Sequence, residues 1–298
     1  VKFIEELNTK IVLYFHNDPL SMVGSKSISE RVSLLSSCSK IIFNSEWSKK
    51  RFLFNMESIY FKSAKLEVIH QSINKEKVNI FKKEKIITFV GKLNLAKGYD
   101  LFGNAIIKIL NQYPDWKSIV IGDEPREKIN FIHKNLKNIG FQNHKKVLEI
   151  FKKTSISVAC SRWEEPFGRT SLEAASRGCA VIISNRGGLP ETITNGIILE
   201  KLTASNVYKE IKKLIDNENQ RIKLQKLSLK NFYLTDDYIS KKIDFYRDNI
   251  INIKRFKYSI IKKLDKLKIL HVTNFNERHN GRLFYNTGRR INNGFVRL

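Results

Sequence analysis

The run Ile156-Ser157-Val158-Ala159-Cys160 leads directly into Ser161-Arg162-Trp163-Glu164-Glu165-Pro166-Phe167-Gly168-Arg169-Thr170-Ser171-Leu172-Glu173. The first part is almost continuously apolar, which is typical of a strand buried on both faces of a parallel sheet. The second part predicts a loop that turns into a helix at 171–177. Because ligands bind beyond the carboxyl ends of parallel strands, we expect this loop at the ligand-binding edge of an α/β sheet.

Further apolar runs and helical patterns alternate on either side of this segment. The expected strands and helices are 86–90, 99–112, 118–122, 145–153 and 180–184. Such an alternation predicts a doubly wound sheet with helices on both faces. We assign this Rossmann-like domain to residues 85–235.

The first 84 residues repeat the alternation in shorter form. The expected elements are a strand at 10–15 that ends at His16, a helix at 29–36, a strand at 40–44, a helix capped by Ser45 and reaching Phe54, and a strand at 66–69. Residues 70–84 are polar and rich in lysine, as a hinge would be. We therefore expect a partial Rossmann-like domain and hinge over 1–84.

After residue 235 the pattern changes twice. A helical segment is expected at 236–264, and it includes a helix over 236–251. The segment 265–298 then begins with a strand, Lys268 to Thr273, followed by a loop with Gly281 and a helical pattern. A strand, a glycine-containing loop and a helix in this order usually open a Rossmann-like module.

The composition leaves a binding function open. The 298-residue chain carries a formal charge of +25, with a pI near 9.9, so a polyanion such as nucleic acid or an anionic lipid surface is a conceivable partner. However, the lysines are spread along the chain, as in 209–213, and no nucleic-acid-binding signature accompanies them. We favour a compositional bias with no nucleic-acid partner, and keep a polyanion-binding protein as an alternative.

Hydropathy and cysteine usage restrict the location. No apolar run approaches the roughly 20 residues that a membrane-spanning helix needs, so we expect any membrane contact to be peripheral. Cys38, Cys160 and Cys179 are odd in number and form no Cys-x-x-Cys pair, which argues against a disulfide framework and a zinc site. We expect a cytoplasmic protein, with a peripheral position at the inner face of the membrane as an option. The start at Val1, with no apolar leader, is expected of a cut end.

An anion site is predicted where the central loop meets its helix. Gly168 lets the backbone approach a ligand closely, and the amides that follow it form a helix N-terminus that favours a phosphate. Glu165 and Glu173 flank this cradle with seven residues between them. A ligand with central phosphates and hydroxyl-rich ends would match. The simpler alternatives are that Glu165 is a solvated loop carboxylate, and that Thr170 and Glu173 form a capping box in a helix closed by Gly178.

The register of these residues resembles the family 4 retaining glycosyltransferases of the GT-B fold. Their signature has two glutamates separated by seven residues and embedded in Glu-x-Phe-Gly, then a helix and a Gly-Gly turn. The matching segments here are 165–168, 172–175, 178–181 and 187–191. The resemblance implies an α/β protein of GT-B type with two Rossmann-like domains, the N-terminal one incomplete.

The resemblance also implies roles for individual residues. The catalytic candidates are Glu165, which would hold the donor sugar, His16, which would face the transferred sugar, and Lys97, which would bind the diphosphate. Lys92 stands where the family has an arginine, so it keeps the charge and loses bidentate geometry. The other donor-binding candidates are Gly91, Gly122, Phe141, Phe167, Gly168, Arg169, Thr170 and Glu173, the last of them on the ribose.

The resemblance implies that the opening part of the N-terminal domain would lie before Val1. The segment 265–298 looks like such a beginning at the other end of the chain. It could open a second transferase module, or it could complete the first sheet as in a circular permutation. We favour the second module, because one strand and one helix cannot replace half a domain.

We therefore expect a retaining glycosyltransferase that moves a sugar from a nucleotide-diphosphate sugar to a glycan or lipid-linked acceptor. No cofactor or metal is expected, since lysines and a helix dipole can stabilise the leaving diphosphate. A catalytically incomplete fragment that binds nucleotide sugar without turnover is the main alternative. A sugar-nucleotide epimerase also uses Rossmann-like domains, and the Glu-Pro-Phe-Gly register speaks against it.

Overall fold

Two parallel sheets organise the chain. The computed structural model describes residues 10–57, 63–127 and 129–251, all of which fall in one compact unit. The module expected at 265–298, and the part of the expected helical segment that follows residue 251, lie outside these residues.

The larger sheet has six strands in the order β6-β5-β4-β7-β8-β9, all parallel. Its strands are β4 (Glu84–Val90), β5 (Lys117–Ile121), β6 (Leu136–Asn138), β7 (Thr154–Ala159), β8 (Ala180–Ser184) and β9 (Ile197–Leu199). The strand order reverses between β4 and β7, and such a switch point opens a crevice at the carboxyl ends of the two strands. We call this sheet and its helices, residues 84–231, the C-lobe.

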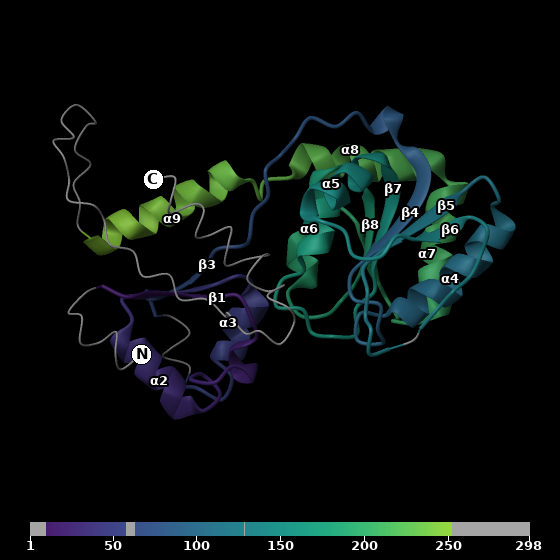
Figure 1. Cartoon of the computed structure of the whole chain (residues 1–298). Helices are drawn as coiled ribbons and strands as arrows, with labels where there is room; N and C mark the ends of the chain where they lie inside the picture. The colour runs from purple at the N-terminus through teal and green to yellow at the C-terminus, as the bar shows by residue number, and fades with distance from the viewer. Residues whose placement is uncertain (1–9, 58–62, 128, 252–298) are drawn as a thin grey trace. The chain divides into compact units, whose positions relative to one another are not determined.

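Helices cover both faces of the six-stranded sheet (Figure 1). They are α4 (Tyr99–Gln112), α5 (His144–Lys153), α6 (Arg169–Ser176), α7 (Ala204–Asp216) and α8 (Glu218–Asn231). One hydrophobic cluster contains residues of α4 and α7, such as Phe102 and Ile211, and another contains residues of α5 and α6, such as Val147 and Leu172. Because both faces of the sheet are covered, its central strands need apolar side chains on both sides, which explains their continuous apolar runs.

The smaller sheet has three parallel strands in the order β1-β2-β3. Its elements are β1 (Val12–Phe15), the short 3-10 helix η1 (Pro19–Ser21), α2 (Ile28–Ser37), β2 (Lys40–Phe43), α3 (Glu46–Phe52) and β3 (Leu66–Val68). Phe15, Phe43 and Phe52 form its core, with ring centroids 5.2 to 5.5 Å apart. Ser45 accepts a hydrogen bond from the amide of Ser48, which confirms the predicted cap of α3. We call the described residues from 10 to 73 the N-lobe.

The chain crosses between the two lobes at two adjacent places. Ile73 forms a parallel bridge with Thr235, and its amide donates to the carbonyl of Leu234 at 3.1 Å. The first crossing continues through η3 (Ile80–Lys82) into β4. After the second crossing, α9 (Asp236–Ile251) returns to the N-lobe, where the hydroxyl of Tyr246 donates to the carboxylate of Glu67 at 2.7 Å.

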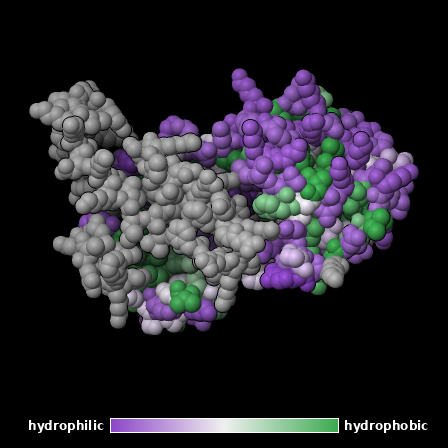
Figure 2. All heavy atoms as spheres, viewed as in Figure 1, coloured by the Kyte–Doolittle hydropathy of each residue, from purple (hydrophilic) through white to green (hydrophobic). Residues whose placement is uncertain are grey.

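The surface of the C-lobe agrees with the dispersed lysines of the sequence. Hydrophilic residues cover most of its visible face, with apolar residues scattered among them (Figure 2). Across the described ranges, no helix is both long and apolar enough to span a membrane. Cys38, Cys160 and Cys179 are all buried.

Candidate functional site

A pocket of about 220 Å³ lies at the switch point of the six-stranded sheet, beyond the ends of β4 and β7. The loop after β4, the loop after β7 and the first residues of α6 build its walls. It is lined by Phe89, Val90, Gly91, Lys97, Ala159, Ser161, Glu165, Gly168, Arg169, Thr170 and Leu189. Six of the residues singled out from the sequence therefore share one pocket, namely Gly91, Lys97, Glu165, Gly168, Arg169 and Thr170.

Gly168 determines how the loop enters α6. Its φ of +105° lies in the left-handed region, and an added Cβ would meet Leu189 at 2.4 Å, so both conformation and space call for glycine. Gly168 is the N-cap of α6 and offers no side chain to cap the helix. The amides of the first turn thus begin the helix beside the pocket without the usual side-chain partner, an arrangement that suits an anion.

Lys97 and Glu165 form an ion pair inside the pocket. The Glu165 side chain is 13% exposed and that of Lys97 is 32% exposed. The amide of Lys97 also donates to Asn94 Oδ1 at 2.9 Å, which fixes the loop after β4. The two residues expected to hold the diphosphate and the donor sugar therefore neutralise each other in the pocket.

Glu173 lies on α6 behind the pocket wall, with its side chain only 6% exposed. His144, the first residue of α5, contacts it with Nε2 at 2.9 Å, and Arg169 reaches it at 3.4 Å. The alternative of a capping box between Thr170 and Glu173 is wrong, because the helix already begins at Arg169 and Gly168 is its N-cap. Glu173 instead holds Arg169, which lines the pocket.

The end of α6 confirms the expected role of Gly178. Its φ is +68°, and its amide donates to the carbonyl of Ala175 at 2.9 Å. The amide of Cys179 donates to the carbonyl of Ala174 at 3.1 Å. These two bonds form a Schellman motif, which ends the helix and leads directly into β8.

His16 follows β1 on the N-lobe and does not line the pocket. Its Nδ1 lies 3.1 Å from Gln71 Nε2, and the ring of Tyr14 lies 4.2 Å away between centroids. Burial, followed by the charge of Arg169, lowers the pKa of His16 to about 4.

Besides Glu173, four of the expected donor-binding residues lie outside the pocket lining. The Phe167 side chain is only 2% exposed and packs in a hydrophobic cluster that includes Ile42 of the N-lobe and Leu172 of the C-lobe, and the donor contact expected of Phe167 stays a prediction. Lys92 is exposed and Phe141 is 55% exposed. Gly122 packs so closely on the loop after β4 that an added Cβ would meet the carbonyl oxygen of Gly91 at 1.8 Å, which makes its role that of a spacer.

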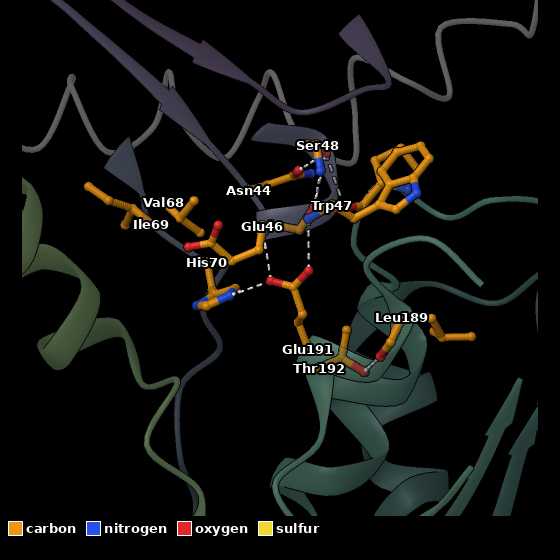
Figure 3. Close-up of polar contacts among 12 residues, drawn as sticks. Asn44, Glu46, Trp47, Ser48, Val68, Ile69, His70, Leu189, Glu191 and Thr192 are labelled. Atoms are coloured by element: carbon orange, nitrogen blue, oxygen red, sulfur yellow. Dashed lines mark hydrogen bonds and ion pairs between the residues drawn. The ribbon is translucent and has the colours of Figure 1, made fainter. Parts of the chain in front are cut away.

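The sequence reasoning did not single out Glu191, which belongs to the 3-10 helix η4 (Leu189–Thr192). Its carboxylate accepts hydrogen bonds from the amides of Glu46 and Trp47 at 2.7 and 3.0 Å, and lies 3.0 Å from Nε2 of His70 (Figure 3). Burial alone would raise the pKa of Glu191, and the hydrogen bonds from His70 and the two amides outweigh it and hold the pKa below its usual range. Two features of the sequence could have indicated this contact. They are the predicted helix cap at Ser45 and the turn Gly187-Gly188-Leu189-Pro190-Glu191.

Comparison with known proteins agrees with this architecture. The family described as glycosyl transferases group 1 matches residues 70–230. Spore coat protein SA of Bacillus subtilis is 31% identical over 163 residues, covering 49% of this chain and 43% of the relative. An uncharacterized glycosyltransferase of Methanocaldococcus jannaschii is 30% identical over 184 residues, covering 58% of this chain and 45% of the relative.

The fold also resembles solved structures. HepE of Anabaena, determined in complex with UDP, superposes with a TM-score of 0.68 at 16% identity, covering 83% of this chain and 74% of that one. The likeness places the two lobes in the GT-B fold, as predicted. The matched region is 43 to 45% of the length of the two relatives above, so it spans less than half of each. With a family match over more than half of its residues, this chain belongs to the glycosyl transferases group 1.

Proposed function

We propose that the protein is a retaining glycosyltransferase that binds a nucleotide-diphosphate sugar in the C-lobe pocket and transfers the sugar to a glycan or lipid-linked acceptor. The observation that carries this proposal is the pairing of Lys97 with Glu165 beside the uncapped start of α6, at the switch point of the sheet. Cation, carboxylate and helix amides in one crevice suit a ligand that has both phosphates and hydroxyls.

The charges around the pocket favour a diphosphate. Lys97 and Arg169 contribute +2 and Glu165 contributes −1, so the charged side chains that line the pocket sum to +1. A diphosphate that binds to Lys97 would replace Glu165 as its partner, and the released carboxylate could then accept hydrogen bonds from sugar hydroxyls. We assign the diphosphate to Lys97 and the amides of residues 168–170 on this basis.

Glu173 suits the other end of the donor. It is buried and fixed by His144 and Arg169, and a fixed carboxylate accepts hydrogen bonds from hydroxyls with little loss of entropy. We assign it to the ribose of the nucleotide. The UDP bound to HepE of Anabaena supports a uridine diphosphate sugar as the first donor to test.

In the proposed reaction, the bond between the anomeric carbon and the phosphate oxygen breaks and the acceptor oxygen bonds to the same face of that carbon. The acceptor proton passes to the departing phosphate oxygen. Stabilisation of the negative charge on the leaving diphosphate is the main catalytic contribution, and the positive charges of Lys97 and Arg169 would supply it. Glu165 is the carboxylate in the pocket lining and is held by Lys97, so we assign no covalent nucleophile.

We include metal independence in the proposal, because Lys97, Arg169 and the start of α6 can together neutralise the leaving group. In the described part of the chain, no group of three or more His, Cys, Asp or Glu side chains is arranged as a metal site. Turnover in a chelating buffer should then stay within about twofold of turnover with added magnesium. A strict requirement for the metal would contradict this part.

The cytoplasmic location and the peripheral membrane contact stay predictions. The second candidate function is donor binding without turnover. Binding of UDP with no sugar release or transfer by the full-length protein would establish this alternative. Steep salt-dependent binding of polyanions that free UDP does not compete with would instead favour the polyanion-binding alternative.

A turnover assay with a panel of uridine, guanosine and adenosine diphosphate sugars tests the proposal. We expect wild-type full-length protein to release nucleoside diphosphate with one of them, and Glu165→Gln to lower the rate roughly 100-fold. Glu164→Gln is the matched control, because this neighbouring carboxylate accepts from Arg186 and the amide of Gly187 and does not line the pocket. Equal rates in the two variants would remove the assignment of Glu165.

A further inference from the structure

The first turn of α3 in the N-lobe receives its hydrogen-bond acceptors from both lobes. Helices leave the amides of their first turn without a partner inside the helix. In α3, the amide of Ser48 donates to the Ser45 hydroxyl at 3.0 Å, within the lobe. The amides of Glu46 and Trp47 donate to Glu191 of the C-lobe at 2.7 and 3.0 Å.

Two further contacts join the same elements. The Ser45 hydroxyl donates to the carbonyl of Pro166 at 2.6 Å. An added Cβ at Gly188 would lie 2.7 Å from the Cβ of Ser45, so the backbone of Gly188 packs directly on this cap. His70, which follows β3 in the N-lobe, completes the ring of contacts around the Glu191 carboxylate (Figure 3).

The C-lobe side of this contact is continuous with the walls of the pocket. Pro166 directly follows Glu165, and Glu191 lies two residues after Leu189, and both Glu165 and Leu189 line the pocket. The amide of Gly188 also donates to the carbonyl of Glu165 at 2.6 Å, which ties the two loops together. A movement of α3 would therefore displace the loops that line the pocket.

The N-lobe side of the contact is continuous with His16. Asn44 directly precedes the cap Ser45, and its side chain donates to the backbone carbonyl of His16 at 2.9 Å. Asn44 also accepts from the hydroxyl of Ser48 at 2.8 Å. Fixing the start of α3 thus fixes the strand end that carries His16.

We propose that Glu191 is a positioning residue that latches the N-lobe onto the loops of the donor pocket and fixes the strand end that carries His16. The chain crosses between the lobes at residue 73 and at residues 234–235, and away from these crossings the carboxylate joins the lobes by accepting two helix amides and contacting His70. The catalytic part of this inference rests on the proposed function. Its structural part does not.

The test combines a distance between the lobes with kcat and the donor affinity in the full-length protein. Spin labels at Ser33→Cys on α2 and Lys209→Cys on α7 report the distance between the lobes, since both positions are exposed and the three cysteines at 38, 160 and 179 are buried. Glu191→Gln places amide hydrogens among the donors and should broaden the distance distribution. It should also lower kcat roughly tenfold to 100-fold, and leave the calorimetric affinity for the donor within about threefold.

Glu30→Gln is the matched control, because Glu30 accepts from the amide of Ser27 at the start of α2, within one lobe. It should leave both the distance and kcat unchanged. His70→Gln keeps the Glu191 carboxylate. It should therefore broaden the distance distribution and lower kcat by less than Glu191→Gln does. If Glu191→Gln fails to fold, His70→Gln tests the latch in its place.

A wild-type distance distribution in Glu191→Gln, or in His70→Gln where only that variant folds, would overturn the latch. A wild-type kcat in a variant with a broadened distribution would overturn the positioning role. Lack of sugar transfer by the wild-type protein would overturn the proposed function, and the distance comparison would still decide the latch.

Discussion

The carboxyl edges of the two sheets present opposite kinds of chemistry. The six-stranded sheet carries charges in pairs, Lys97 with Glu165 and Arg169 with Glu173. The three-stranded sheet carries two neutral side chains, Tyr14 and His16, at the end of β1, where burial raises the pKa of Tyr14 and lowers that of His16 to about 4. Burial and then the charge of Arg169 disfavour a protonated His16, so this side chain is neutral for a physical reason.

This contrast separates two tasks. Paired charges that can exchange their partners for a ligand supply binding energy for a diphosphate. Neutral polar groups held by neighbours, as His16 is by Gln71 and Asn44, supply orientation at a low electrostatic cost. We therefore expect substitutions in the C-lobe to change donor affinity and substitutions at the N-lobe edge to change turnover.

The largest expected effect is that of Lys97→Met, which keeps most of the side-chain length and removes the charge. We expect the affinity for UDP in a calorimetric titration to fall roughly 100-fold, because a charge-assisted contact to the diphosphate is lost and Glu165 is left unpaired beside it. Lys85→Met serves as the control, since Lys85 pairs with Asp115 on the surface, away from the pocket lining. A loss of less than threefold would contradict the division of tasks.

A smaller effect is expected for Glu173→Gln. The wild-type protein should bind 2′-deoxy-UDP roughly tenfold more weakly than UDP, because the ribose hydroxyl would lose a carboxylate acceptor. The variant should bind the two nucleotides about equally. Undiminished discrimination in the variant would place the ribose elsewhere.

The pH dependence of stability sharpens the N-lobe side of the comparison. The pKa of His16 is about 4 in the folded state, below its ordinary value of 6.5, because of burial and then the charge of Arg169. As pH falls from 6.5 to 4, the unfolded chain binds a proton that the folded chain excludes, so stability decreases through this window. In His16→Gln, the midpoint of urea unfolding should fall less between pH 6.5 and 4 than in the wild-type protein. A pH profile of the midpoint parallel to that of the wild type would show that His16 does not titrate this way.

The smallest effect is expected for Lys92→Ala. Lys92 is exposed and lies outside the pocket lining, so UDP affinity should change by less than about threefold. A loss as large as that of Lys97→Met would mean that the loop after β4 rearranges when the donor binds.

The sequence predicted the fold best where burial is complete. The strand at 180–184 and the helices at 99–112 and 236–251 were placed to the residue. The other predicted elements were off by up to two residues at either end, as short caps and frayed ends allow. Strands β6 and β9, each of three residues at an edge of the sheet, were missed.

The site was predictable as far as it is local in sequence. The spacing around Gly168 placed the loop, the start of α6 and Glu165 correctly relative to one another. The pairing of Lys97 with Glu165 joins residues 68 positions apart, and Glu191 contacts α3 across 144 and 145 positions. Such pairings follow from how loops and lobes pack, which no short spacing encodes.

A crystal structure of the full-length protein with UDP tests the central claim most directly. We predict that the diphosphate lies within hydrogen-bond distance, about 3 Å, of Lys97 Nζ and of the amides of residues 168–170, with Glu165 released from Lys97. A diphosphate bound outside this pocket, with the Lys97–Glu165 pair intact, would contradict the account.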